Sequence, residues 1–540
     1  DRRKMSSIQE FLKDGSRHYQ GTEEATLRNI EACKDLTQVV RTSLGPNGMN
    51  KMVINHLEKL FVTSDAATII KELEVVHPAA KMVVMASKQQ EQEVGDNTNL
   101  VVVFAGELLQ QAESLIRMGL HISDIVFGYK KAGAKALELL ETLVISSLDN
   151  LKDQALVEKA IRSAVTSKQL EWEHHLVPAI AKACIETLPQ NPSAFNVDSV
   201  RCCKITGGSV ADTQFIHGFA LVKDVNGTIR HVKNAKVVVF AGGIEAPKTE
   251  SKGTVLLTTA DELLNYSKGE ESQMETIVKN IADSGANVVV SGGAISALAL
   301  HYLERYKIMV LREGSKFQLR RICRATGATP LARVGKPLPE ELGECEEVTV
   351  DEVGSTKVTF FRNSSERCQI ATLLIRGPTQ NTMDDVERAV DDAVNVYKAL
   401  IRDPRLLAGA GASELELARI LMPFGDAAPG LDQYAIKKYA EALEVIPRIL
   451  ADNSGLDSSE IVSSLYAAHT QGKTTFGVNV EAAEIGDAVA INVFDAFIGK
   501  YWALKLATDA ALTILQVDQI IMAKAADGPK VPQMGARDAD

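Results

Sequence analysis

Apolar residues recur at helical spacing toward both ends of this 540-residue chain. Residues 21–42 and 383–400 each carry an apolar stripe at intervals of three and four positions, which predicts amphipathic helices. A strongly apolar segment from Leu100 to about Met118 predicts a longer helix, and further helices are expected to about residue 148. Helical patterns dominate again after residue 380.

The pattern changes near residue 200, where short apolar runs alternate with helical stretches. Such runs are typical of buried strands in an α/β unit, and here they span residues 236–240, 254–258, 287–290 and 308–311. Residues 345–375 alternate polar and apolar positions, which predicts antiparallel strands. Two further short strands are expected at residues 51–55 and 60–63, joined by a polar turn.

Length and the order of these patterns indicate the domain organisation. A chain of this length exceeds one core and predicts about three or four domains. The patterns run helical, then α/β, then helical, so the expected fold class is multidomain α+β/α. This order permits nesting, in which the two ends of the chain meet in one domain. The residues after Lys524 show no periodicity and are expected to be disordered.

Composition narrows the class of protein. Apolar residues make up 45% and charged residues 24%, as in ordinary soluble globular proteins, and the formal net charge of −11 argues against a general nucleic-acid role. The longest apolar run, residues 286–303, is interrupted by Gly292, Gly293 and His301, so no membrane span is expected. Seven cysteines without C-x-x-C spacing and the absence of a signal-peptide pattern indicate reduced thiols in a cytosolic protein.

Residues 44–51 form a glycine-containing loop between a predicted helix and a predicted strand. Gly45 and Gly48 lack side chains, so backbone N–H groups could approach phosphate oxygens, and Pro46 stiffens the turn. A plain helix–strand turn has the same composition, and the loop alone does not distinguish the two interpretations.

A second polar segment, residues 95–99, precedes the apolar helix that follows. Asn97 or Thr98 could cap this helix, whose N-terminus would favour phosphate. Asp96 would then be placed to hold a Mg²⁺ ion that bridges phosphates. An aspartate beside an ordinary N-cap remains the alternative.

Two further polar or small-residue segments, residues 63–68 and 409–414, also begin predicted helices. Converging helix N-termini can build an anion pocket, although each segment alone is more often structural. The helix at 383–400 carries several acids opposite its apolar stripe, and a solvated acidic face is the default expectation. Nothing in its periodicity selects Asp392 from the other acids.

These segments, in this order, resemble the group II chaperonins, the ring-forming ATPases of archaea and the eukaryotic cytosol. The resemblance covers nearly the whole chain and includes the loop at 44–51, residues 63–69, 95–99, 166–168, 287–293, 387–393 and 409–414. Closer similarity to one subunit type of the eukaryotic complex TRiC lies in Asn50–Phe61, His77–Met82, Gln433–Lys438 and Gly499–Ala507.

The resemblance implies a nested arrangement of three domains. An equatorial ATP-binding domain would comprise residues 1–147 and 402–540, and an intermediate hinge domain residues 148–217 and 370–401. An apical substrate-binding domain, residues 218–369, would carry a helical protrusion at about 245–277 that helps to form a lid over the ring cavity.

The resemblance also implies roles for individual residues. Asp65 and Asp392 match acids that orient the attacking water, and Lys168 matches a lysine that senses the γ-phosphate. Asp96 matches the magnesium ligand. The remaining matches are to nucleotide-binding positions, namely Leu44, Gly45, Pro46 and Gly48 in the phosphate loop, Asn97, Thr98 and Asn99 beside Asp96, and Gly409, Gly411 and Asp495 near the base and ribose.

Four positions depart from the usual family pattern, and one of them is Asn99, which replaces a threonine. Asn97, Ala66 and Ala410 stand where glycines are common, and Asn97 adds a side chain where the backbone should approach phosphate. All the acids are retained, so ATP or ADP with Mg²⁺ is the expected ligand.

The expected function is an ATP-hydrolysing subunit of a hetero-oligomeric double ring that folds client proteins such as actin and tubulin. A slow-turnover subunit that acts mainly as scaffold and client-contact surface is the alternative. Residues 315–327 could form a basic helical face for clients, and a solvated helix is an equally good interpretation.

Overall fold

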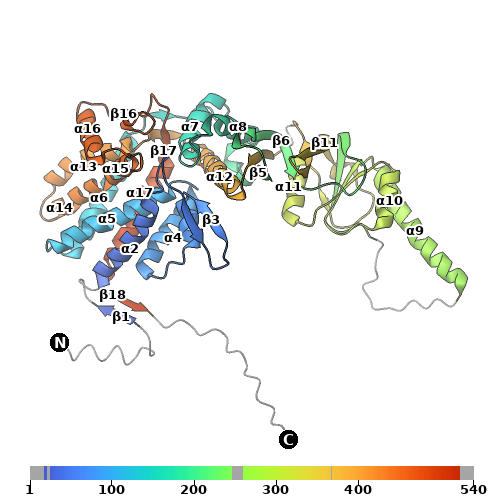
Figure 1. The fold of residues 1–540 in the computed structure, drawn as a ribbon, viewed down its shortest axis with the longest axis horizontal. Coiled ribbons are helices and arrows are strands. Elements are labelled where there is room, and N and C mark those ends of the chain that lie inside the picture. The colour runs from blue at the N-terminus through green and yellow to red at the C-terminus, as the bar shows by residue number, and fades with distance from the viewer. Residues whose placement is uncertain (1–16, 21–24, 246–258, 366–367, 523–540) are drawn as a thin grey trace, which may run out of the picture.

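The computed structural model describes residues 17–20, 25–245, 259–365 and 368–522. The described chain is elongated, with a helical body at one end and a sheet-containing body at the other (Figure 1). Both the N-terminal and the C-terminal parts of the chain contribute helices to the helical body, and the middle of the chain forms the sheet (Figure 1). The multidomain α+β/α fold class predicted from the sequence is confirmed.

The helical body packs helices from the two ends of the chain around one apolar core. Its helices are α2 (Leu27–Arg41), α3 (Ala66–Glu72), α4 (Pro78–Glu93), α5 (Thr98–Arg117), α6 (Ile122–Thr142), α13 (Ala412–Ala427), α14 (Asp432–Leu443), α15 (Val445–Asn453), α16 (Ser458–Thr470) and α17 (Phe497–Leu515). One cluster of buried side chains contains residues of α2 to α6 and of α13, α14, α15 and α17, whereas α16 packs in a smaller cluster with Leu415 and Val478. The two ends of the chain therefore share a core, as the nesting hypothesis expects.

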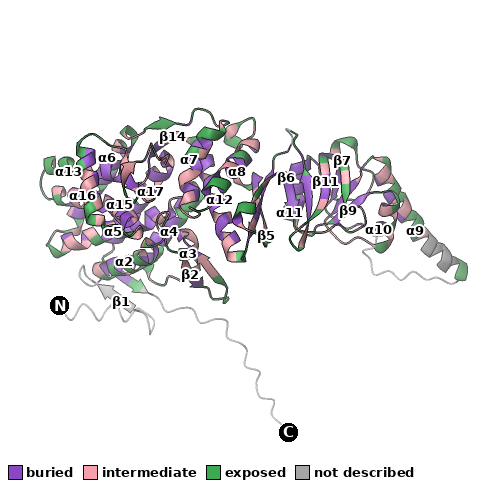
Figure 2. Ribbon diagram, turned by 45° about the horizontal axis from the view of Figure 1, so that its top comes forward, coloured by how far each residue is buried: buried purple, intermediate pink, exposed green. Residues whose placement is uncertain are grey.

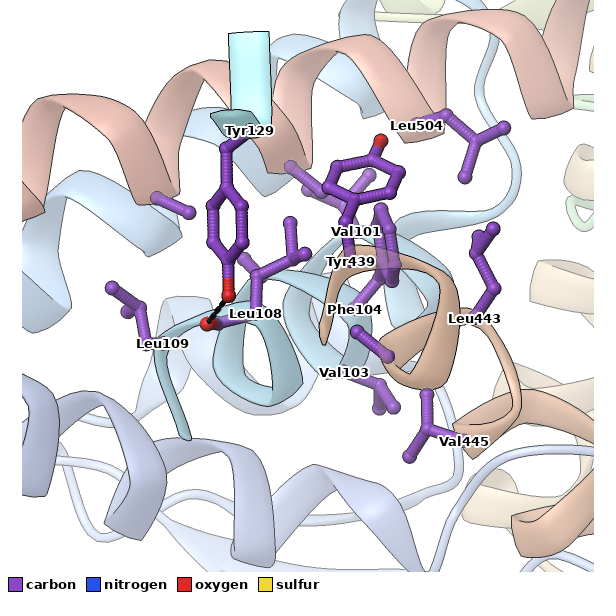
Figure 3. Packing of buried hydrophobic residues seen from close by; sticks show 14 of the residues in the cluster. Val101, Val103, Phe104, Leu108, Leu109, Tyr129, Tyr439, Leu443, Val445 and Leu504 are labelled. Carbon is purple, nitrogen blue, oxygen red and sulfur yellow. Dashed lines mark hydrogen bonds between the residues drawn. The ribbon is translucent and has the colours of Figure 1, made fainter. Parts of the chain in front are cut away.

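Aromatic contacts join these helices at the centre of the core. Tyr439 on α14 makes edge-to-face contacts with Phe104 on α5 and Tyr129 on α6, with ring centroids 5.5 and 5.7 Å apart. The hydroxyl of Tyr129 donates a hydrogen bond of 3.0 Å to the carbonyl oxygen of Leu108 (Figure 3). Each of these rings is fully buried, so the contacts fix α5, α6 and α14 relative to one another.

Short strands border the helical body. They are β1 (Arg17–Gln20) with β18 (Gln519–Met522), β2 (Lys51–Ile54) with β3 (Leu60–Thr63), β15 (Phe476–Asn479) with β16 (Glu484–Asp487), and β14 (Arg405–Ala408) between β17 (Phe494–Ala496) and β4 (Ser146–Ser147), all antiparallel. The β2–β3 hairpin is the pair of strands predicted from residues 51–55 and 60–63.

Three helices lie between the helical body and the sheet: α7 (Gln154–Thr166), α8 (Glu173–Glu186) and α12 (Gln380–Arg402) (Figure 1). Their apolar faces pack with one another and with the first strands of the sheet in a second buried cluster. Helix α12 also contacts β3 of the helical body. It therefore connects the two parts of the molecule.

The large sheet runs in the order β5, β13, β6, β12, β11, β7, β8, β9, with β10 paired to β7. The strands are β5 (Val200–Thr206), β6 (Gln214–Leu221), β7 (His231–Phe240), β8 (Val288–Ser291), β9 (Met309–Arg312), β10 (Pro330–Leu331), β11 (Gly343–Val353), β12 (Thr356–Arg362) and β13 (Ala371–Gly377). The accompanying helices are α9 (Ala260–Asp283), α10 (Ala297–Arg305) and α11 (Lys316–Thr326), with short 3₁₀ turns at Pro192–Ala194, Val197–Ser199, Val210–Asp212 and Pro339–Glu341.

Pairing within this sheet follows the pattern of the sequence. Strands β7, β8 and β9 are parallel and fully buried along their apolar runs, whereas β11 and β12 are antiparallel, as predicted for this part of residues 345–375. Buried positions concentrate along these strands and along the inner faces of the helices (Figure 2). The strand predicted at 254–258 and the tail after Lys524 lie outside the described residues.

The expectation of a solvated acidic face on α12 is wrong. Of the acids opposite its apolar stripe, only Asp391 is exposed. Asp384 and Glu387 both bond Lys204 of β5, Asp385 is buried, and Asp392 pairs with Lys168. Neighbouring elements cover this face, which periodicity within one helix cannot reveal.

The expectation of reduced cysteines and the expectation of no membrane span can be compared with the structure. All seven cysteines lie among the described residues and are free thiols. Among the described helices, none is both long and apolar enough to cross a bilayer. The domain boundaries drawn from the sequence stay a prediction.

Candidate nucleotide-binding site

Most of the predicted site residues meet at one cavity of about 430 Å³. The cavity lies where the helical body meets α7 and α12, and its lining combines segments that are hundreds of positions apart in the chain. The predicted residues that line it are Leu44, Gly45, Pro46, Asp65, Asp96, Asn97, Thr98, Asn99, Lys168, Asp392, Gly411 and Asp495.

Two predicted residues, Gly48 and Gly409, do not line the cavity and instead shape its loops. A Cβ on Gly48 would lie 2.4 Å from the carbonyl oxygen of Ser43, so only glycine fits this turn. A Cβ on Gly409 would lie 2.8 Å from Cγ1 of Val493 and 3.2 Å from Oδ2 of Asp495. Both glycines are therefore needed for close packing behind the cavity wall.

Three helices begin at the cavity. Helix α3 follows Asp65, α5 follows Asn97, and α13 follows Gly411. Helix N-termini present free N–H groups and a partial positive charge, so together they favour an anionic ligand. The glycine loop adds backbone that comes close to the ligand space, because Gly45 has a φ of 87° that ordinary side chains disfavour.

Lys168 pairs with two acids from different parts of the chain. Its Nζ lies 2.5 Å from Oδ2 of Asp392 on α12 and 3.3 Å from Oδ1 of Asp65 at the start of α3. The lysine side chain is 7% exposed and the two carboxylates are 16% or less exposed. Asp65 also accepts hydrogen bonds from the backbone N–H and the hydroxyl of Thr68, which fixes its orientation.

Burial and charge shift the pKa values of this cluster in different directions. Burial raises the pKa of Asp392 well above its ordinary value, and nearby Asp96 and Asp65 raise it further despite Lys168. Burial also raises the pKa of Asp96. For Asp65, burial is outweighed by Lys168 and the Thr68 hydrogen bonds, which lower its pKa. Although burial opposes it, Asp392 and Asp65 raise the pKa of Lys168, so the lysine stays protonated.

The acids outnumber the cation at this end of the cavity. Asp65, Asp96 and Asp392 face the single ammonium group of Lys168. Within the described ranges, no group of three metal-ligating side chains could hold a metal ion alone. Mg²⁺ is usually bound by one or two carboxylates together with phosphate oxygens and water. The cluster therefore fits a magnesium ion that arrives with a phosphate ligand, with Asp96 as its carboxylate.

A second buried ionic group also lines the cavity. The ammonium group of Lys500 on α17 forms ion pairs with Glu414 on α13 and with Asp495, the latter at 3.0 Å. Glu414 and Lys500 are 1% and 4% exposed. Because Asp495 is held by Lys500 and lines the cavity, one of its oxygens has a fixed position relative to a bound ligand.

Comparisons with known proteins show the family of the chain. A family model described as the TCP-1/cpn60 chaperonin family matches residues 36–525. The chain belongs to this family. T-complex protein 1 subunit theta of Dictyostelium discoideum is 53% identical over 536 residues, covering 99% of this chain and 100% of that protein. The theta subunits of Gallus gallus and Homo sapiens are 53% and 52% identical over 539 residues, covering 99% of this chain and 98% of each relative.

The group II chaperonin resemblance, with its closer similarity to one subunit type, is thereby confirmed. In this chaperonin chain, Asn97 occupies the left-handed region with a φ of 63°, where asparagine is better tolerated than most residues. Its backbone N–H donates a 2.6 Å hydrogen bond to Oδ1 of Asp96, and its amide nitrogen lies 3.4 Å from Oδ2 of the same carboxylate. Asparagine thus preserves the backbone shape that glycine would adopt and also orients Asp96.

The capping expectation for the same segment is wrong. Asn97 occupies the N-cap position of α5, but its side chain caps no backbone N–H, because the left-handed backbone turns it toward Asp96. Thr98 is the first helical residue. The N-terminal N–H groups of α5 are therefore not satisfied by a side-chain cap, which suits a binding role.

Sequence reasoning missed four charged residues that line the cavity of this chaperonin: Arg162, Glu414, Glu481 and Lys500. Arg162 bonds both carboxylate oxygens of Glu173 and the carbonyl oxygen of Ile491. A signal was present for Lys500, because it is a single charge within the apolar start of α17. A buried lysine in such a stretch needs an acidic partner, which the sequence alone does not identify.

Proposed function

We propose that this chain is an ATP-binding and ATP-hydrolysing subunit of a hetero-oligomeric double-ring chaperonin in the cytosol. The observation that carries the proposal is the convergence of three acids, one lysine and three helix N-termini on one cavity. Phosphoryl transfer depends mainly on positioning and charge neutralisation, and this cavity supplies both.

Different residues of the cavity would bind the phosphates, the metal ion, and the base with its ribose. The loop at Leu44–Gly48 and the N-terminus of α5 would bind phosphate oxygens through backbone N–H groups. Lys168 would neutralise charge at the terminal phosphate, and Gly411 with Asp495 would hold the base and ribose. Asp96 would hold Mg²⁺, which neutralises phosphate charge when bound.

Asp392 and Asp65 would orient the attacking water and accept its proton. A raised pKa makes the Asp392 carboxylate a better proton acceptor than an ordinary aspartate. Because α12 lies between the helical body and the sheet, a shift of α12 would move Asp392 relative to the phosphate-binding segments. Hydrolysis would then depend on closure, which couples ATP to a change of shape.

The relatives named as T-complex protein 1 subunits support assembly with paralogous subunits. Folding of clients such as actin and tubulin follows from the family resemblance. The exposed Phe317 and the basic residues of α11 offer one surface for them.

A slow-turnover subunit is the second candidate, and Asn97 is the observation that favours it. Its amide nitrogen approaches the Asp96 carboxylate that would hold the metal ion. In this case the subunit would bind nucleotide and act mainly as scaffold and client-contact surface.

Assembly and labelling test the ring membership and nucleotide binding that both candidates share. Hydrolysis in rings that carry Asp392→Ala only in this subunit separates the two, because an unchanged rate would favour the slow-turnover subunit. The purified protein should elute as a large particle with paralogous subunits and appear as stacked rings in negative-stain images. A photoreactive ATP analogue should label this subunit in the presence of Mg²⁺, and excess ATP should prevent the labelling. A particle of single-subunit size, or no labelling while neighbouring subunits are labelled, would contradict the proposal.

A further inference from the structure

Asp385 is a buried carboxylate that the proposed chemistry does not use. It lies on α12 seven positions before Asp392, which is two helical turns along the same side. The residue is 5% exposed, although Asp384 beside it is partly exposed. A buried carboxylate is costly unless it is fully bonded, so its partners indicate its purpose.

The two oxygens of Asp385 bond two different segments of the site. The hydroxyl of Thr63 donates to Oδ1 at 3.1 Å, and the amide nitrogen of Gln169 donates to Oδ2 at 2.9 Å. Thr63 ends β3 and is itself fully buried, and Gln169 follows Lys168 directly. One carboxylate on α12 thus contacts the segments that carry Asp65 and Lys168.

The Thr63 hydroxyl extends this connection to Asp65. It accepts a hydrogen bond of 3.1 Å from the backbone N–H of Asp65 while it donates to Asp385. The backbone N–H of Gln169 is bonded to Val165, so its side chain is free to reach α12. Lys168 and Arg388 are charged groups near Asp385, and a guanidinium nitrogen of Arg388 lies 3.8 Å from Oδ1.

We propose that Asp385 is a positioning residue for hydrolysis: it holds the Thr63–Asp65 and Lys168–Gln169 segments against α12, so that Asp65, Lys168 and Asp392 meet in one arrangement. The proposal rests on the proposed ATP hydrolysis at this cavity. Asp385 forms hydrogen bonds with Thr63 and Gln169, which lie near Asp65 and Lys168 in the chain. It bonds none of the three reacting side chains. Its loss should therefore disturb their alignment and leave the phosphate loop and the base-binding wall in place.

The proposed role of Asp385 depends on hydrogen-bond geometry, so asparagine at this position should support it nearly as well as aspartate. In Asp385→Asn, the amide oxygen still accepts from Thr63, and the amide nitrogen can donate to Gln169 after its side-chain amide rotates. Asp385→Ala removes both bonds. A matched control is Asp384→Asn, which removes a carboxylate from the same helix that bonds Lys204 and faces β5.

The test uses assembled rings that carry each variant in this subunit only. Asp392→Ala rings first establish how much hydrolysis this subunit contributes. Asp385→Ala should lower that contribution about tenfold to a hundredfold in kcat, because a misplacement of about 1 Å can cost a hundredfold, with KM changed less than twofold. Asp385→Asn should retain most of the contribution, and Asp384→Asn should equal the unmodified ring.

Hydrogen exchange in the same rings gives a second readout. Backbone amides of residues 63–68 and 166–169 should exchange faster in Asp385→Ala and not in Asp384→Asn. If Asp385→Ala rings do not assemble, Gln169→Ala removes one of the two bonds and should give a smaller loss of kcat in the same direction.

The outcomes distinguish this proposal from the proposed function. If Asp392→Ala changes nothing, ATP hydrolysis by this subunit is wrong, and hydrogen exchange alone decides whether Asp385 holds the two segments. The positioning role is overturned by unchanged exchange in both segments, by an unchanged kcat in Asp385→Ala, or by an Asp385→Asn variant as impaired as Asp385→Ala.

Discussion

Two buried clusters of charged side chains in this protein differ in whether their charges are balanced. At the cavity, Asp65, Asp96 and Asp392 face one lysine. Elsewhere in the helical body, Glu416 on α13 is paired with Arg419 of the same helix and with His469 at the end of α16. Glu416 is 2% exposed and His469 is 1% exposed, whereas the Asp65 and Asp392 side chains at the cavity are 16% and 15% exposed.

The Glu416 cluster is complete in itself. Arg419 donates two hydrogen bonds to the carboxylate, at 2.6 and 3.0 Å, and Nδ1 of His469 lies 2.7 Å from Oε2. Nε2 of His469 lies 2.8 Å from the carbonyl oxygen of Phe476, which can only accept. The imidazole of His469 therefore bridges Glu416 and Phe476, and the guanidinium of Arg419 balances the charge of the Glu416 carboxylate.

The comparison separates a structural ion cluster from a candidate binding site. Balanced charges with every bond satisfied need no further partner, and they join α13, α16 and β15. The cavity cluster retains an excess of negative charge beside helix N-termini, which a cation and a phosphate group together would satisfy. Removing an acid should therefore lower the rate of hydrolysis when the acid lies at the cavity. Removing Glu416 should instead lower the free energy of unfolding.

The largest effect is expected for Asp392→Ala in this subunit. The subunit's hydrolysis should fall by about 10²–10⁴, because a well-placed proton acceptor is lost. The free energy of unfolding should change by less than about 1 kcal/mol, because Lys168 keeps Asp65 as its partner. Single-turnover hydrolysis in assembled rings and urea unfolding of the subunit measure the two quantities. An unchanged rate together with a large loss of stability would show that Asp392 has a structural role, like Glu416.

Glu416→Gln should give the opposite result, with a loss of about 1.5–3 kcal/mol in unfolding free energy, because it removes the buried carboxylate that Arg419 and His469 both contact. Hydrolysis should change much less than in Asp392→Ala. The exposed Glu460→Gln on α16 is the control and should remain within about 0.5 kcal/mol.

The same variant has a defined pH dependence. Although burial raises it, the hydrogen bonds from His469 and Arg419 lower the pKa of Glu416 from 4.5 to about 2. A lowered folded-state pKa stabilises the protein fully above about pH 4.5, and this contribution is lost as the pH falls toward 2. The difference between the unmodified protein and Glu416→Gln should therefore shrink in this window, and a constant difference would contradict the assignment.

The smallest effect concerns the backbone beside the cavity. Ala410 and Gly411 are consecutive left-handed residues, with φ of 57° and 78°. Ala410→Gly should raise the free energy of unfolding by about 0.5–1 kcal/mol, because relief of the strained φ exceeds the entropy cost of glycine. Gly411→Ala should lower it by more than about 1 kcal/mol, since the added Cβ would also lie 3.0 Å from Cβ of Pro447. Equal stabilities in urea unfolding would show that this loop is unstrained.

Sequence patterns predicted the elements better than the contacts between them. The apolar stripes and runs predicted α5, α12, β7, β8 and β9, because each element's periodicity is a local property. The roles of α12 acids could not be predicted in this way. Neighbouring elements cover Asp385 and Asp392 but leave Asp391 exposed, and that difference depends on long-range packing.

The candidate site likewise contains some residues that local sequence identifies and others that only long-range packing brings together. The loops around Gly45 and Asp96 were recognisable because glycine and a helix-start aspartate have local meaning. Asp392 and Gly411 were added by the family resemblance, and the structure brings both to the cavity. The structure also changes the interpretation of Asn97, whose left-handed backbone preserves the shape expected of glycine.

The most direct test is a density map of the assembled ring with a non-hydrolysable ATP analogue and Mg²⁺. The account predicts nucleotide density in this subunit's cavity, with the phosphates beside Gly45, Thr98 and Lys168 and a metal ion at Asp96. Nucleotide density in neighbouring subunits without any in this cavity, or nucleotide bound elsewhere on this chain, would contradict the central claim.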